Sequence, residues 1–341
     1  MRRSWLEWLL DAIDRVPGPR WAASVGAYLV LVALLLLANY LDGVSVLIET
    51  PGLSLGPLIG FGLLWGIHVL SAGALRTLGA LEPVLTVDDA ERERFGQDLT
   101  RTPPAWALVA LVMGTIGGLD SLATTPETWG APATGAPATL AITAVVAVLN
   151  TTMILVFVAR LLHQTLVIDQ IHRHAVRVDL TQLEPLYGFA AFIARASIVL
   201  LSISIGGFVG FLVALGLSFT LAASDLYLFG ATIVVAVVAF VLPVRGLHER
   251  IEAEKDRGLA ESRSTLATIT AEIHRRVAGG DLEGAGKLND ALSAANAAVA
   301  VIAHTPTWPW RPETLRAFVS AVLLPIALWA VITILGRVFG A

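Results

Sequence analysis

The side chains best suited to chemistry form a histidine and carboxylate cluster that follows the fourth long apolar run of the chain. Asp169 and His172 stand three residues apart, which places them on one helix face, and His174 follows two residues later. Carboxylate oxygens and imidazole nitrogens are ligands of zinc and similar ions. A third firm ligand at a diagnostic spacing is missing, and Arg173 and Arg177 lie beside the cluster. We therefore interpret it as a solvated basic segment and expect neither a metal nor another cofactor.

No other motif in the sequence indicates a reaction. The chain contains no cysteine, which excludes disulfides, thiolate metal sites and cysteine nucleophiles. Neither an HExxH pair nor a Ser/His/Asp arrangement is present, and the acidic pairs lie in polar segments. We expect no enzymatic activity and no nucleic-acid partner.

Composition identifies the class of protein that must position these residues. Of the 341 residues, 56% are hydrophobic and 15% are charged, and the mean hydropathy is +0.74. These values lie outside the range of ordinary soluble domains. Most of the length falls into apolar runs of about 20 residues, long enough to cross roughly 30 Å of hydrocarbon. We predict an all-α integral membrane protein with about seven transmembrane helices.

The distribution of basic residues predicts how the chain crosses the bilayer. The predicted spans are Trp21–Leu41, Pro57–Leu78, Pro104–Ser121, Thr139–Leu162, Ser197–Ser218, Leu226–Pro243 and Leu315–Leu335. The connections after the first, third and fifth spans contain no lysine or arginine. Arg160 lies inside a span but in the turn nearest the basic side, and Arg337 alone lies on the other side. By the positive-inside rule the N-terminus is inside and the C-terminus outside the cytoplasmic membrane.

Two segments outside the spans have their own helical patterns. Residues 1–20 are predicted to form an N-terminal interfacial helix, with Trp5 and Trp8 at headgroup depth. Residues 21–244 hold six spans, residues 245–311 form a cytosolic α-helical hairpin broken at Gly279-Gly280, and residues 312–341 hold the last span. Where the hairpin returns to the membrane, we interpret Trp308 and Trp310 as further interface anchors.

Polar and small residues within the spans are the remaining candidates for function. No acidic or basic residue lies near the centre of a span, which argues against a carrier built on a buried carboxylate. The candidate pore-lining residues are His68, Asn150, Thr151, Thr152 and Ser204. These side chains could line a pore in an oligomer or join neighbouring helices. The small-xxx-small pairs predicted to pack helices closely are Gly62 with Gly66 and Gly206 with Gly210.

Two functional hypotheses follow from these patterns. The first is a homo-oligomeric channel or pore in which the hairpin serves assembly or gating. The alternative is a non-transporting membrane sensor or scaffold whose hairpin, residues 245–304, binds a cytosolic partner protein. The first hypothesis expects self-association in the lipid bilayer, and the second expects a stoichiometric soluble partner. A secondary transporter fits poorly because the chain shows no internal repeat.

Overall fold

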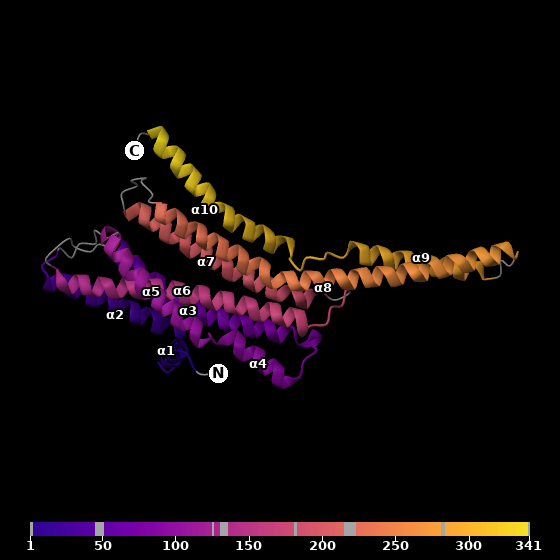
Figure 1. Cartoon of the computed structure of the whole chain (residues 1–341), viewed down its shortest axis with the longest axis horizontal. Coiled ribbons are helices and arrows are strands. Elements are labelled where there is room, and N and C mark those ends of the chain that lie inside the picture. The colour runs from indigo at the N-terminus through magenta and orange to yellow at the C-terminus, as the bar shows by residue number, and fades with distance from the viewer. Residues whose placement is uncertain are drawn as a thin grey trace.

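The chain folds into long helices that lie side by side (Figure 1). The computed structural model describes residues 3–44, 51–124, 126–129, 136–180, 183–214, 223–280 and 284–339. Within these ranges the α-helices are α1 (Trp5–Asp14), α2 (Arg20–Leu41), α3 (Pro51–Ala80), α4 (Asp89–Thr100), α5 (Pro104–Thr124), α6 (Pro137–His174), α7 (Tyr187–Ala214), α8 (Ala223–Ala278), α9 (Ala285–His304) and α10 (Pro312–Phe339). Short 3-10 helices occupy Glu82–Val84, Pro126–Trp129 and Glu184–Leu186.

Six helical segments in the described ranges are long and apolar enough to cross a membrane. They begin at Trp21, Ile59, Asp89, Pro137, Glu184 and Gly230. The prediction of an all-α membrane protein is confirmed at this level. The count of seven spans and the direction in which the chain crosses the membrane remain predictions.

Helix α6 lies at the centre of the bundle and packs against α3, α5 and α8. Its buried residues include Phe157 and Ile168, which join Leu63 and Ile67 of α3 in the main hydrophobic core. A second core cluster joins α7, α8 and α10 around Phe240. Because α6 contacts so many partners, a side chain on it can reach several elements at once.

Helices α5 and α6 approach most closely at glycines that the sequence analysis did not single out. A Cβ atom on Gly114 would lie 2.5 Å from the Cα atom of Thr152, and one on Gly118 would lie 2.6 Å from that of Val148. Only hydrogen fits at these two positions. The pair is a GxxxG motif, which permits such close helix contact.

The glycine pairs predicted to pack helices behave differently from one another. A Cβ atom on Gly66 would lie 3.1 Å from the ring of Phe157, whereas one on Gly62 would meet nothing within 4 Å. Gly66 therefore packs against α6, whereas Gly62 is exposed and contacts no other helix within the described ranges. Gly206 and Gly210 lie in α7, but their surroundings fall outside the described residues.

Helices α8 and α9 form the predicted hairpin and extend together past the other helices (Figure 1). We call the end of the bundle from which they project the hairpin end. Helix α8 ends at Ala278, and Gly280 follows with a φ of 70°, so the predicted break at Gly279-Gly280 is confirmed. At the other end of the hairpin, α8 continues through Pro243 without interruption. One helix therefore belongs to both the bundle and the hairpin.

Helix α1 is docked on the bundle by its apolar face. Ser4 caps its N-terminus by accepting a hydrogen bond from the backbone N–H of Glu7, and Leu6 and Leu10 are buried in the main core. Trp5 donates its indole N–H to the carbonyl oxygen of Ala107, at 2.8 Å. Trp8 points away and is 70% exposed. Of the two predicted anchors on this helix, one faces protein and the other faces the surroundings.

Candidate functional site

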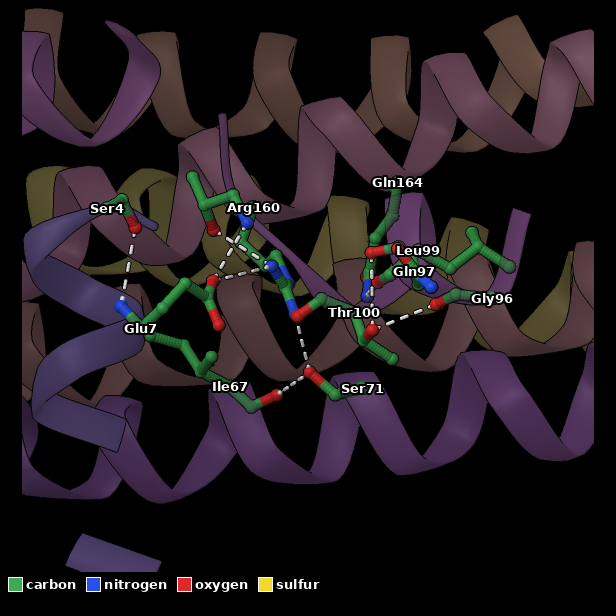
Figure 2. A network of polar contacts seen from close by, with 11 residues as sticks. Ser4, Glu7, Ile67, Ser71, Gly96, Gln97, Leu99, Thr100, Arg160 and Gln164 are labelled. Carbon is green, nitrogen blue, oxygen red and sulfur yellow. Dashed lines mark hydrogen bonds and ion pairs between the residues drawn. The ribbon is translucent and has the colours of Figure 1, made fainter. Parts of the chain in front are cut away.

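The guanidinium group of Arg160 is completely buried at the junction of α6 with three other segments (Figure 2). Its Nη1 atom donates to Thr102 Oγ1 at 2.9 Å, and its Nη2 atom donates to Ser71 Oγ at 2.8 Å and to the carbonyl oxygen of Thr100. Glu7 of α1 completes the group, with its Oε1 atom 3.6 Å from Nη1. We call these five residues the Arg160 network.

The turn between α4 and α5 explains why an arginine is needed here. Helix α4 stops at Thr100 because Pro103 and Pro104 follow, and its last carbonyl groups have no partner within the helix. Arg160 satisfies the carbonyl of Thr100, and Gln164, one turn later on α6, donates its Nε2 to the carbonyl of Leu99 at 2.8 Å. Two side chains of α6 thus cap the C-terminal end of α4.

Glu7 supplies the charge that balances the buried guanidinium. Its Oε1 atom also accepts a hydrogen bond from the backbone N–H of Thr102 at 2.9 Å, and its side chain is 15% exposed. A buried charge without a partner is very costly, so the pair is needed wherever one of its members is buried. Since Glu7 lies on α1, the N-terminal helix is part of the folded bundle.

The Arg160 network is suited to holding elements together and not to a reaction. Arginine remains protonated in proteins and cannot exchange protons with a substrate. Its partners here are hydroxyl groups, a carbonyl and one carboxylate that already accepts a backbone hydrogen bond. The network therefore joins α1, α3, α4 and α6 into one unit.

The fold separates the members of the histidine and carboxylate cluster, and the prediction that the segment is solvated is wrong for His172. His172 is fully buried, and its Nδ1 donates to the carbonyl oxygen of Pro243 on α8 at 2.8 Å. Asp169 forms an ion pair with Arg173 at 2.8 Å, and His174 bonds to the carbonyl of Gln170 on the exposed side of α6. Within the described residues, no three potential ligands converge on a metal position.

His172 belongs instead to a joint between α6 and the base of the hairpin. Its ring meets Phe189 of α7 edge-on, at a centroid distance of 5.6 Å. Arg250 of α8 donates its Nη1 to the carbonyl oxygen of His172 at 2.8 Å. The contacts of Pro243 and Arg250 with the same histidine fix α8 against α6 where the hairpin leaves the bundle.

A column of aromatic rings forms a second joint at the base of the hairpin. It consists of Phe318, Phe240, Trp310, Trp308 and His248, in that order. Successive ring centroids lie 4.0, 4.9, 4.6 and 4.0 Å apart. The column starts on α10, passes through Phe240 of α8 and the segment that returns from α9, and ends at His248, again on α8. Trp308 and Trp310, predicted as membrane anchors, thus stack within the protein, with Trp308 still 39% exposed.

The candidate pore-lining residues face different neighbours. Asn150 lies opposite Gly60 of α3, where a Cβ atom would be 3.6 Å from its Oδ1. Thr151 and Thr152 face Gly117 and Gly114 of α5. His68 is half-buried on α3, and the surroundings of Ser204 on α7 fall outside the described residues. Asn150, Thr151 and Thr152 pack against helices of the same chain, and conduction remains a prediction.

Helix α9 carries a row of exposed apolar side chains that we call the α9 outer face. It consists of Ala291, Ala294, Ala298 and Val301, spaced by three, four and three residues. All four are exposed, and Val301 is 66% exposed. No charged residue lies on α9 between Ala291 and Val301.

The Arg160 network was not predicted, because Arg160 lies in the last turn of a predicted span and was assigned to the membrane surface. The available signal was Thr100-Arg101-Thr102 before two prolines, which predicts unsatisfied helix carbonyls that an arginine could bind. Comparisons of the chain with protein-family models, with curated proteins and with solved structures found no match. Function is therefore inferred from the geometry alone.

Proposed function

We propose that the protein is a non-transporting membrane scaffold or sensor whose hairpin, α8 with α9, binds a helix of a partner protein. The observation that carries this proposal is the α9 outer face. It is apolar, it is exposed, and its residues repeat with the spacing by which helices pack in coiled coils.

Helix α9 has two apolar rows at heptad spacing. The inner row is half-buried along α8 and consists of Leu288, Leu292, Ala295, Val299 and Ile302. The α9 outer face is the second row, offset by about 100° around the helix at 100° per residue. A helix with two adjacent apolar rows is typical of bundles of three or more helices. The hairpin supplies two helices, so a third from a partner would cover the second row.

A partner helix would stabilise the hairpin, because α8 and α9 bury little apolar side-chain surface against each other. Among the described side chains between residues 252 and 304, none is fully buried. Two packed helices leave most of each surface in water, and burial of apolar area contributes about 25 cal/mol per Å². Small alanine side chains would let the partner helix approach closely.

The rigid attachment of the hairpin to the membrane helices is consistent with a role as a scaffold or sensor. Lys255 of α8 donates its Nζ to the carbonyl oxygens of Ala303 and Thr305, at 2.6 and 2.9 Å, which ties the end of α9 to α8. The continuous α8 and the aromatic column join this base to the bundle. A change in the membrane helices would therefore reach the partner site without a flexible linker. By the positive-inside pattern the hairpin would lie in the cytosol.

The proposal is tested by photocrosslinking in cells with the full-length protein. A benzoylphenylalanine at Ala298, on the α9 outer face, is compared with one at Ser293, on the opposite side of the same helix. We expect one adduct of discrete mass from Ala298 and none from Ser293. A second substitution, Ala294→Glu, should abolish the adduct by placing a charge on the face, whereas Ala300→Glu should not.

The mass of the adduct separates the two functional hypotheses. A mass of this chain plus a different protein, recovered in constant ratio, supports the scaffold. A mass of two copies of this chain contradicts it and favours the homo-oligomeric channel. Equal crosslinking from Ala298 and Ser293 would mean that the face is not recognised.

A further inference from the structure

A cavity of about 330 Å³ lies at the hairpin end, where the segment after α6 meets the first exposed turns of α8. Its walls include Arg177, which follows α6, and Arg250 and Arg257 of α8, together with Glu254 and Thr86. Arg250 and Arg257 stand about two and four helical turns beyond Pro243. The cavity belongs neither to the Arg160 network nor to the α9 outer face.

The charge of the cavity is strongly unbalanced. Three arginines and one glutamate line it, which gives a formal charge of 3 − 1 = +2. The carboxylate of Glu254 is engaged by Arg257, whose Nη1 donates to Oε2 at 2.8 Å. In the part of the chain that the structure describes, the guanidinium of Arg177 has neither an ion pair nor a hydrogen bond. A bound anion would neutralise the remaining positive charge of the cavity.

The backbone of Arg177 and the side chain of Arg250 are held by contacts that do not depend on a ligand. An isolated bridge pairs Leu85 with Val176, so that the N–H of Arg177 donates to the Val84 carbonyl and the N–H of Thr86 donates to the Ala175 carbonyl, both at 2.8 Å. Arg250 is fixed by its hydrogen bond to the carbonyl oxygen of His172. That bond uses Nη1 and leaves the other guanidinium nitrogens of Arg250 available to a ligand. Two separate segments thus bring these arginines together on one cationic surface.

We propose that this cavity binds the phosphate group of an anionic ligand. Guanidinium groups match phosphate oxygens in geometry and bind them with paired, charge-assisted hydrogen bonds. The volume lies at the lower end of the range for small-molecule sites and accommodates a group of headgroup size. Two sources provide this chemistry, namely an anionic phospholipid and a soluble phosphate compound. A ligand there would bridge the end of α6 and the base of the hairpin.

The test uses the full-length protein in a neutral detergent and follows its thermal unfolding. One arm titrates a short-chain phosphatidylglycerol, a second titrates inorganic phosphate, and a third titrates a short-chain phosphatidylcholine, whose choline cation the cavity should repel. We expect a saturable rise in the unfolding temperature with phosphatidylglycerol or with phosphate, and little response to phosphatidylcholine.

Three variants connect the response to the cavity. In the double variant Arg177→Gln, Arg257→Gln the apparent affinity should fall at least about tenfold. The single variant Arg177→Gln, which removes an exposed side chain without disturbing an ion pair, should lower it about threefold to tenfold and serves if the double variant does not fold. Arg263→Gln, an exposed arginine of α8 outside the cavity, should leave the affinity within twofold.

The arms also identify the source of the phosphate. Saturation by phosphatidylglycerol alone assigns the cavity to a lipid headgroup, and saturation by inorganic phosphate as well assigns it to phosphate groups in general. No saturable response to either ligand overturns the proposal. An equal loss of apparent affinity in the Arg263→Gln control also overturns the proposal, because general charge attraction would then explain the binding.

Discussion

Glu7 of α1 and Arg160 of α6 are joined through one residue, Thr102, which bonds to both of them. The hydroxyl group of Thr102 accepts from Arg160 Nη1, and its backbone N–H donates to Glu7 Oε1, each at 2.9 Å. The two charged groups themselves lie 3.6 Å apart. A buried positive charge in the bundle is thus balanced by the N-terminal helix, and neither group is expected to be stable there without the other.

The first prediction concerns this charge balance. Glu7→Gln keeps an acceptor for the Thr102 N–H but leaves Arg160 buried without a counter-charge. We expect the free energy of unfolding in detergent to fall by about 3 kcal/mol. Asp11→Asn on the same helix is the control, since Asp11 pairs with Arg3 in an exposed ion pair, and should change it by less than about 0.5 kcal/mol.

A double-mutant cycle distinguishes charge balance from general disruption of α1. Combining Glu7→Gln with Arg160→Met removes both charges, so the loss should be smaller than the sum of the single losses. Strict additivity would show that the two groups do not interact.

The second prediction concerns the contact between α5 and α6. Gly114→Ala and Gly118→Ala each place a Cβ atom within 2.6 Å of backbone atoms of α6, and the helices must separate to admit it. We expect each variant to lose about 1–3 kcal/mol of unfolding free energy. Gly62→Ala has open space and should be neutral or gain up to about 1 kcal/mol from helix propensity. Similar losses at Gly62 and Gly114 would refute the close contact.

The third prediction concerns the aromatic column at the base of the hairpin. Trp310→Ala removes the ring between Phe240 and Trp308, and should cost about 3 kcal/mol of unfolding free energy. It should also loosen the hairpin, measured as increased mobility of a spin label at the position of Ala300. Trp8→Ala removes an exposed indole of the same size and should change neither quantity. An unchanged spin-label spectrum in Trp310→Ala would mean that the column does not hold the hairpin.

The main helices follow from the sequence because their cause is local. Apolar runs of sufficient length form helices wherever the bilayer or a bundle surrounds them, and Gly279-Gly280 ends α8 by its own backbone preference. The packing of Leu288 and Ile302 against α8 is likewise predicted by the regular spacing of the apolar residues on α9. These features required no knowledge of distant residues.

The site could not be predicted because its members meet only in three dimensions. Glu7, Ser71 and Arg160 are ordinary residues in their own segments, and they form a network only because α1, α3 and α6 meet around the Arg160 guanidinium. His172 was interpreted as solvated, whereas α8 covers it completely. In both cases the position relative to another helix determines burial, and a single sequence does not specify that position.

The fourth prediction separates the scaffold from a channel. Purified protein in liposomes should pass no ions under a cation gradient or an anion gradient, since Asn150 and Thr152 lie against Gly60 of α3 and Gly114 of α5 inside the bundle. Selective flux that changes in Asn150→Leu would contradict this account and restore the homo-oligomeric channel. Empty liposomes and liposomes with a known pore former are the two controls.

The most direct measurement is the rate of maleimide labelling at the α9 outer face. The chain has no cysteine of its own, so Val301→Cys and the neighbouring Ala300→Cys each introduce a single thiol. Rates are compared in permeabilised cells, in detergent, and in liposomes that hold the purified protein. We predict that Val301→Cys reacts at least about tenfold more slowly in cells than in detergent or liposomes, while Ala300→Cys reacts at similar rates throughout. Equal rates for Val301→Cys in all three settings, or protection already in liposomes without a partner, would contradict the proposed function.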